Sequence, residues 1–181
     1  MPPFLLFSVV TEFSAYDDFS KVYETWFPLL YRIVYRMTAR EDISEEVVQE
    51  AFIKYYERRD VLPKDEGLKF WLIRVVRNLA LNYEKRKGRE RRAVERHYHE
   101  PKLDLGHEGE RSVERKETIQ EVQHALLQLP YNLRIVLILK EYAGFAYAEI
   151  GKMLGITEGN VKVRVFRARN QLAQLLGEER S

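Results

Sequence analysis

Apolar residues recur three and four positions apart along most of the chain, which is the spacing of amphipathic helices. The first such stripe runs over 16–38, and Pro28 interrupts it, which favours a kink or two abutting helices. A second stripe follows Ser44, a candidate N-cap, at Val47, Val48, Ala51, Phe52, Tyr55 and Tyr56. Pro63 and Gly67 then indicate a loop. No stretch alternates polar and apolar residues as a strand would.

A third helix is predicted after this loop, with Leu68, Trp71, Leu72, Val75, Val76 and Leu79 facing inward. The same spacing assigns the aromatic pair Phe70 and Trp71 to the core rather than to a ligand-binding surface. The opposite face offers Arg74, Arg77, Asn78 and Asn82, followed by a basic tail after Tyr83. Three amphipathic helices of this size can bury one common core.

A second apolar unit begins near residue 117, after a stretch with few apolar residues and dense mixed charge that we interpret as a flexible linker. In this unit we expect one helix that ends before Pro130, one that ends near Gly144, a short helix over 147–154, and a final helix capped by Thr157. The predicted fold class is all-α, with two small helical domains joined by a flexible charged linker. The expected boundaries are a tail (1–15), the first domain (16–90), the linker (91–116), the second domain (117–176) and a C-terminal tail (177–181).

Composition and charge narrow the function classes. The chain has no cysteine, which excludes a disulfide framework and a thiolate zinc site. No apolar run approaches the ~20 residues of a membrane helix, so no stable membrane insertion is expected. The net charge is only +2, but residues 69–96 carry ten bases and three acids, and a second basic island lies at 158–176. Two basic islands separated by an acidic tract suggest two contacts with one polyanion.

The segment 147–172 has the spacing of a helix-turn-helix. Gly151 is small where two helices must approach closely, and Gly155 occupies the turn. Ile150, Val161 and Val165 fall where a tight helical pair needs apolar contacts. The outer face of the second helix carries Lys162, Val163, Arg164, Phe166 and Arg167, a surface suited to the major groove of DNA.

The segment LPYNLRIVLILKEYAGFAYAEIGKMLGITEGNVKVRVFRARNQL resembles region 4 of the extracytoplasmic-function sigma factors of bacterial RNA polymerase. The segments SEEVVQEAFIKYY and FWLIRVVRNLALNYEKRKGR resemble regions 2.2 to 2.4 of the same family. The resemblance covers residues 16–90 and 117–176, in the order and at the separation of that family. It implies a protein that binds core RNA polymerase and recognises the −10 and −35 elements of promoters.

The resemblance also implies roles for individual residues. Region 2.2 would dock on core polymerase through Glu46, Gln49, Glu50 and Lys54, which share one helical face. The −10 element would be read as single-stranded non-template DNA near the loop 59–67, through Arg74, Arg77, Asn78, Asn82, Tyr83, Lys85, Arg86 and Lys87. The −35 duplex would be read through Lys162, Val163, Arg164, Phe166 and Arg167. Family members often carry serine at the position of Val163, so the sequence preference here is open.

The family further implies an anti-sigma partner, a cytoplasmic location, and a membrane association only through that partner. No cofactor, no metal and no catalytic residue is expected.

Two other function classes remain open from the residues alone. An enzyme with a metal site could use Glu121 and His124, which have the Glu-x-x-His spacing, or His97, His99 and Glu100. The second Glu-x-x-His of a di-metal bundle is missing. An ordinary helix-turn-helix regulator of duplex DNA would explain 117–176, but it leaves the Asn, Arg and Tyr face of the third helix without a role.

Overall fold

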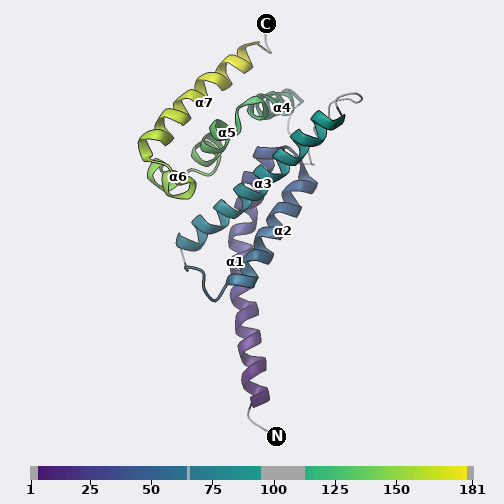
Figure 1. Cartoon of the computed structure of the whole chain (residues 1–181), viewed down its shortest axis with the longest axis vertical. Helices are drawn as coiled ribbons and strands as arrows, with labels where there is room; N and C mark the ends of the chain where they lie inside the picture. The colour runs from purple at the N-terminus through teal and green to yellow at the C-terminus, as the bar shows by residue number, and fades with distance from the viewer. Residues whose placement is uncertain (1–3, 65, 95–112, 179–181) are drawn as a thin grey trace.

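The computed structural model describes residues 4–64, 66–94 and 113–178, and every regular element within these ranges is helical (Figure 1). The elements are α1 (Phe4–Thr38), α2 (Glu41–Arg58), α3 (Glu66–Val94), α4 (Val113–Gln128), α5 (Tyr131–Leu137), the π-helical segment η1 (Ile138–Tyr142), α6 (Tyr147–Leu154) and α7 (Glu158–Glu178). This agrees with the predicted all-α class. Among the described residues, no helix is long and apolar enough to cross a membrane.

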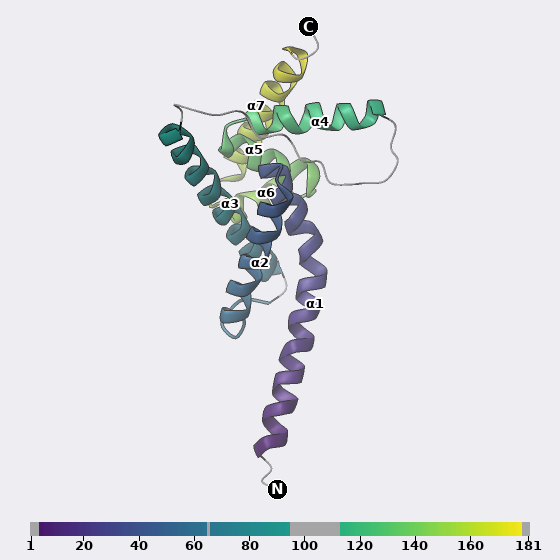
Figure 2. The same cartoon turned by 90° about the vertical axis from the view of Figure 1, so that its right-hand side faces the viewer.

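The N-terminal unit is a bundle of α1, α2 and α3, and α1 continues well past the other two toward the N-terminus (Figure 2). The predicted apolar stripes meet in its core, where Leu30, Met37, Val48, Leu72 and Val76 are completely buried. Trp71 is half-buried and packs against this core, as predicted.

Three local predictions for this unit differ from the structure. Helix α1 begins at Phe4, inside the segment expected to be a tail, and it runs through Pro28 without ending. Pro28 is exposed, so water can satisfy the carbonyl group that the proline ring leaves without a donor. Ser44 is not an N-cap, because α2 already begins at Glu41, and the Ser44 hydroxyl donates to the carbonyl oxygen of Arg40 at 2.5 Å.

The early start of α2 follows from the turn before it. Ala39 has a φ of 52°, which ends α1, and Arg40 has extended backbone angles of −131° and 118°, which allow a new helix to begin at once. The main-chain N–H of Ala39 donates to the carbonyl oxygen of Tyr35 at 2.7 Å. The tight turn therefore sets α2 against the last turns of α1 with only two residues between them.

The C-terminal unit contains α4, α5 with η1, α6 and α7. Its core includes Leu126, Leu139, Ile150, Val161 and Val165, all buried. One helix was predicted between Pro130 and Gly144, and in the structure this stretch changes from α-helix to π-helix at Ile138. The final helix begins as predicted, with Thr157 Oγ1 accepting a hydrogen bond from the main-chain N–H of Asn160 at 3.2 Å.

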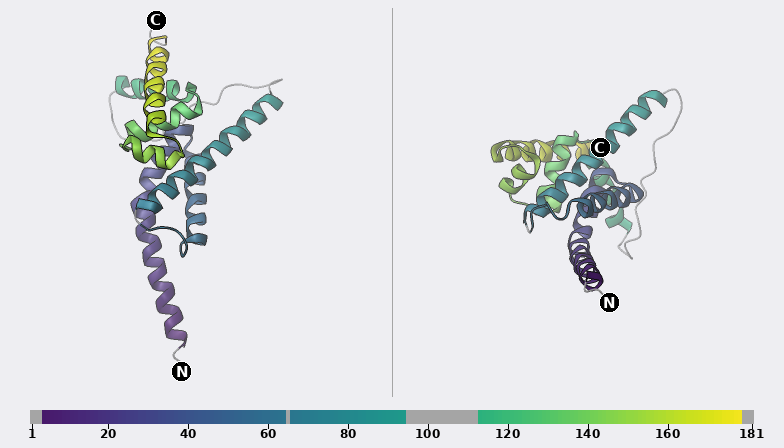
Figure 3. Two further views of the ribbon diagram at one scale, coloured as in Figure 1. Left: turned by 60° about the vertical axis from the view of Figure 1, so that its left-hand side comes forward. Right: turned by 60° about the horizontal axis from the view of Figure 1, so that its bottom comes forward.

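The two units pack against each other. Buried apolar residues of both belong to one continuous cluster, which joins Met37 of α1 to Leu126 of α4 and Ile138 of η1. The C-terminal unit covers one side of α3 and the end of α1 (Figure 3). The chain is therefore closed on itself rather than held as two separate modules.

Candidate nucleic-acid interface

The helix-turn-helix predicted at 147–172 is present and tightly built. Gly155 ends α6 with a φ of 69°, a left-handed conformation that favours glycine. A Cβ atom on Gly151 would lie only 2.8 Å from the main-chain oxygen of Ile156, so this position has no room for a side chain. The main-chain N–H of Ile156 donates to the carbonyl oxygen of Gly151 at 3.0 Å. These contacts fix the angle at which α7 leaves α6.

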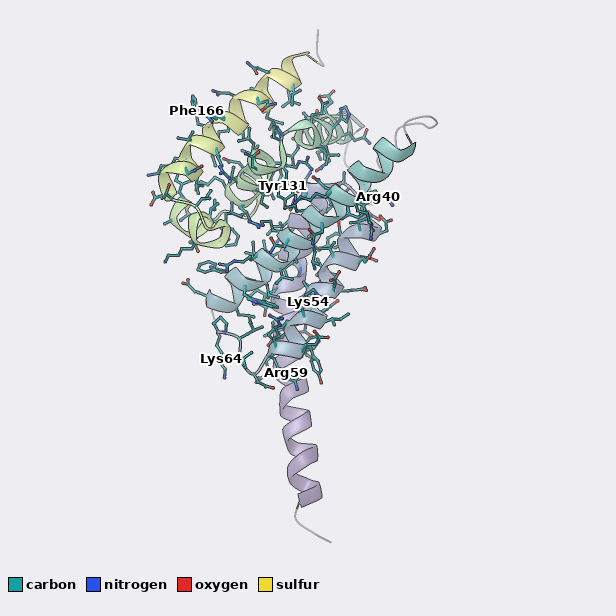
Figure 4. All side chains as sticks on the ribbon, viewed as in Figure 1. Arg40, Lys54, Arg59, Lys64, Tyr131 and Phe166 are labelled. Atoms are coloured by element: carbon teal, nitrogen blue, oxygen red, sulfur yellow. The ribbon has the colours of Figure 1, made fainter. Side chains whose placement is uncertain are left out.

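The outer face of α7 carries two large apolar side chains among its basic ones. Val163 is 49% exposed and Phe166 is 64% exposed, and Figure 4 shows Phe166 on α7, far from the labelled Lys54 of α2. Arg167 is exposed on the same side, whereas Arg164 is half-buried. A helix face that combines apolar and guanidinium groups can contact thymine methyl groups, guanine edges and phosphates.

Two bases of α7 already have acidic partners. Lys162 Nζ lies 2.7 Å from Glu158 Oε1, and this hydrogen bond raises the pKa of Lys162. Arg169 Nε donates to Glu141 Oε1 at 3.1 Å. Both pairs are solvent-exposed and worth little in free energy, so a phosphate can compete for either base. An open hollow between α6 and the start of α7 is lined by Glu158 of the first pair and by Lys152, Gly155, Thr157 and Asn160 among others.

Helix α3 carries the residues predicted for the −10 element, and these residues do not all share one environment. Arg74, Asn78, Asn82, Lys85 and Arg86 are exposed. Arg77, Tyr83 and Lys87 are half-buried. The Arg77 Nε group donates to Asn78 Oδ1 at 3.0 Å, which orients the amide of Asn78.

Part of this α3 surface is engaged by the other unit. Arg74 Nη2 donates to the carbonyl oxygen of Lys152 in α6 at 3.3 Å. The Tyr131 hydroxyl of α5 donates to the carbonyl oxygen of Arg77 at 2.7 Å. Neither contact is visible in the residue pattern, because isolated polar residues on amphipathic helices are ordinarily solvated.

Helix α2 presents the residues predicted to dock on core polymerase. Glu46 and Gln49 are exposed, and the half-buried Glu50 and Lys54 form an ion pair of 3.2 Å. Ile53 is 59% exposed and Tyr56 is 49% exposed beside them. The apolar spacing assigns Tyr56 to the inner stripe, which is wrong. It leaves out Ile53, which lies between Phe52 and Lys54 but off the stripe. Exposed apolar side chains among charges are typical of a protein-binding surface.

The predicted single-stranded DNA loop lies between α2 and α3. The guanidinium of Arg59 lies 4.1 Å from the ring centroid of Tyr56 and donates to the main-chain oxygen of Tyr56 at 2.6 Å. The loop thus begins with the half-buried Arg59 held against the exposed Tyr56 near the end of α2.

The metal alternatives gain no support from the described part of the chain. It holds no group of three or more His, Cys, Asp or Glu side chains that could bind a metal ion. Glu121 is half-buried and His124 is exposed on α4. His97, His99 and Glu100 lie outside the described residues.

Comparison with known proteins identifies both units. Residues 22–90 match the family model of Sigma-70 region 2, and residues 119–172 match that of Sigma-70, region 4. The ECF RNA polymerase sigma-E factor of Escherichia coli K12 is 33% identical over 147 residues, covering 77% of this chain and 76% of that protein. The ECF sigma factor SigE of Mycolicibacterium smegmatis is 29% identical and covers 84% of this chain, which spans 59% of the length of that relative.

A solved structure is similar over both units. The sigma factor RpoE of Bartonella quintana, in complex with the anti-sigma factor NepR, superposes with a TM-score of 0.71 at 27% identity. The match covers 88% of this chain and 97% of that one.

Proposed function

Because the chain belongs to the ECF family of RNA polymerase sigma factors, we propose that it directs core RNA polymerase to promoters through three separate surfaces. Its function is promoter recognition and transcription initiation, and it supplies no catalytic chemistry of its own. The surfaces are the outer face of α7 for the −35 duplex, the exposed face of α3 for the −10 element, and α2 for core polymerase.

The outer face of α7 is proposed to enter the major groove. Arg167 pairs with a guanine edge or a phosphate, while Val163 and Phe166 contact apolar base edges such as the thymine methyl group. Lys162 and Arg164 neutralise phosphates. The support for this surface is the helix-turn-helix geometry, in which Gly151 and Gly155 hold α7 at a fixed angle with these side chains outward.

The exposed face of α3 is proposed to hold the −10 element as single-stranded non-template DNA. Asn78 and Asn82 offer amides to base edges, and Tyr83 offers a ring for stacking. Arg74, Arg77, Lys85, Arg86 and Lys87 hold the backbone. Capturing bases outside the duplex costs a few kcal/mol per unstacked base, so several contacts must act together on one strand.

The surface of α2 formed by Glu46, Gln49, Glu50 and Lys54 is proposed to dock on core polymerase, with Ile53 and Tyr56 as its apolar centre. Exposed charges set the orientation of such contacts, whereas buried apolar side chains carry most of the affinity. The single observation that carries the whole proposal is that both sigma regions lie on one chain, residues 22–90 and 119–172. A helix-turn-helix regulator that acts without polymerase would account only for the second.

We also propose an anti-sigma partner and a cytoplasmic site of action, where RNA polymerase works. The support is the similarity to RpoE, a sigma factor solved with its anti-sigma factor. Such a partner would hold the protein at a membrane only if the partner itself is anchored there.

The deciding experiment adds the purified chain to bacterial core polymerase and a library of promoter fragments. Discrete transcription start sites that require the chain are the expected result. The variant Ile53→Asp tests the docking surface separately. It should abolish transcription while leaving duplex binding by the C-terminal unit intact. Duplex binding by the unaltered chain with no effect on initiation would contradict the proposal and favour a simple regulator.

A further inference from the structure

The side of α7 that faces away from the core has its own residue pattern. Val161, Val165 and Ala168 point into the core and are at most 1% exposed. At 3.6 residues per turn, the opposite side of the helix carries one line of residues, all exposed. We call this line the outward stripe, and it consists of Gly159, Val163, Phe166, Arg167 and Asn170. Figure 4 shows Phe166 on the side of α7 that is turned away from the rest of the molecule.

The first half of the outward stripe has no side chain that can form a hydrogen bond. Gly159 has no side chain, and a Cβ atom there would meet nothing within 4 Å, so the space before Val163 is open. Val163 and Phe166 are apolar, with 49% and 64% of their surface exposed. In the major groove, bases are distinguished by hydrogen bonds or by the C5-methyl group of thymine. Contact with a methyl group is therefore the base-specific readout open to these two side chains.

Cationic side chains lie along both edges of the outward stripe. Helix geometry places Lys162 and Arg169 along one edge and Arg164 along the other. Such groups neutralise phosphates, which are the charged walls of the major groove, whereas the methyl groups lie on its floor. An apolar centre between two cationic edges thus matches the major groove of duplex DNA.

Val163 and Arg167 are neighbours on the stripe, because residues four positions apart have Cβ atoms about 5–6 Å from each other. Successive base pairs are about 3.4 Å apart along the duplex. With Arg167 on a guanine edge, Val163 therefore lies over a base pair one or two steps away. A thymine there presents its methyl group to Val163. 5-Methylcytosine carries a methyl group on the same ring carbon, whereas cytosine and uracil do not.

We propose that Val163, with Phe166 beside it, makes −35 binding depend on a C5-methyl group close to the guanine that Arg167 reads. The ligand is a duplex that contains a 5-methylpyrimidine, either thymine or 5-methylcytosine. This inference rests on the −35 role proposed above for α7 and adds a new dependence to it. A promoter whose cytosine at that position is methylated is bound more tightly than the same promoter with an unmodified cytosine.

The test uses core polymerase loaded with the full chain and a −35 duplex selected from the promoter library. Each pyrimidine of the element is made in turn as thymine, deoxyuridine, cytosine or 5-methylcytosine, opposite its matching base, and closed-complex affinity is measured at low temperature. We expect one position at which thymine binds better than deoxyuridine and 5-methylcytosine better than cytosine. Each ratio should be about fourfold, the value of burying one methyl group.

Two variants on α7 identify the side chain that is responsible. Val163→Ala removes the two methyl groups of the valine and should bring both affinity ratios close to one. Lys162→Ala is the matched control, because loss of a phosphate contact should weaken binding of all four duplexes by a common factor and leave the ratios unchanged. Each ratio compares two duplexes on one protein preparation, so a loss of folded protein does not alter it.

The possible failures are distinguishable. Equal affinity for the methylated and unmethylated base at every position would overturn the inference, as would undiminished ratios in Val163→Ala. A thymine effect without a 5-methylcytosine effect would overturn the dependence on cytosine methylation. If the loaded polymerase binds none of the duplexes, the function proposed above fails instead.

Discussion

Arg134 and Glu84 form an ion pair across the two units, and both side chains are largely buried. Burial raises the pKa of Glu84, and the charge and hydrogen bond of Arg134 act in the opposite direction. A raised carboxyl pKa means that the folded state binds this proton more readily than the unfolded state does. The contribution of Glu84 to stability is therefore greatest below its ordinary pKa and is lost as the pH rises through the pKa of Glu84 in the folded state.

Replacing Arg134 by methionine should lower the free energy of unfolding by about 3–5 kcal/mol at pH 7, because it leaves a buried carboxylate without its partner. The loss should be smaller near pH 4, where Glu84 can take up a proton. Urea unfolding at the two pH values measures both. Adding Glu84→Gln to Arg134→Met should recover part of the lost stability. If the double variant instead loses the sum of the two single losses in free energy, Arg134 and Glu84 do not interact as a buried pair.

Glu149 behaves in the opposite sense. The hydrogen bond from the Ala146 N–H lowers its pKa, and Lys69 lowers it further. Its contribution is therefore complete above the unfolded pKa and is lost as the pH falls through the lower folded value. Glu149→Gln should lower the free energy of unfolding by about 0.5–1 kcal/mol at pH 7. In strong acid, where Glu149 is protonated in both the folded and the unfolded state, the substitution should have no effect. Thermal melts of both proteins across this range test the expectation, and a constant difference at all pH values would disprove it.

The turn of the helix-turn-helix should tolerate alanine differently at its two glycines. Gly155→Ala puts a Cβ atom into open space but keeps a left-handed backbone, so we expect a loss of about 1–2 kcal/mol. Gly151→Ala drives the Cβ atom against the main chain at Ile156, and a backbone contact can give way only by moving α7. The Gly151 variant should therefore lose −35 binding beyond what its stability predicts. Unfolding curves measure the loss of stability, and duplex affinities measured on the same variants show whether the displacement of α7 weakens −35 binding beyond that loss.

Arg167→Ala should weaken binding of the −35 duplex by about 1–3 kcal/mol if Arg167 pairs with guanine. Arg169→Ala is the matched control on the same helix, because Arg169 is already paired with Glu141. Fluorescence anisotropy with a labelled duplex gives both affinities. Equal effects of the two substitutions would mean that only general charge matters at this face.

Asn78→Ala should weaken formation of the open complex more than binding of the closed complex, because only melted DNA presents base edges to α3. Permanganate footprinting reports the melted bases, and a mobility shift at low temperature reports the closed complex. Asn132→Ala, an exposed asparagine of the C-terminal unit, serves as the control. Equal losses in both assays would refute this division between the two DNA surfaces.

The helical class and most of the core are predictable from the sequence, because apolar spacing follows directly from helix geometry. The same spacing assigns Trp71 correctly and finds the turn at Gly155. It fails at Tyr56, which lies four positions after the buried Phe52 and yet is 49% exposed near the end of α2. The start of α2 is also misplaced, since Ser44 looks like a cap and the real turn rests on Ala39.

The packing of the two units could not be predicted from the sequence at all. It depends on Arg134, Gln123, Lys69 and Tyr131, polar residues that normally face water, and a charged linker suggests only a loose tether. Nothing in the residue pattern distinguishes a solvated arginine from one that reaches a carbonyl group 97 positions away, as Arg134 reaches Met37. The roles of individual residues in binding DNA and polymerase remain predictions.

The π-helical segment Ile138–Tyr142 has a mechanical consequence. A π turn holds about one residue more than an α turn, so it takes up an extra residue without redirecting the chain that follows. Deleting a single residue there would turn the segment into ordinary α-helix and leave both its length and the direction of α6 and α7 nearly unchanged. A deletion in the α-helical part of the same stretch lacks this slack, because each α-helical residue contributes about 100° of rotation. The π turn is thus the place in this stretch where the loss of one residue would preserve the aim of the DNA-reading helix.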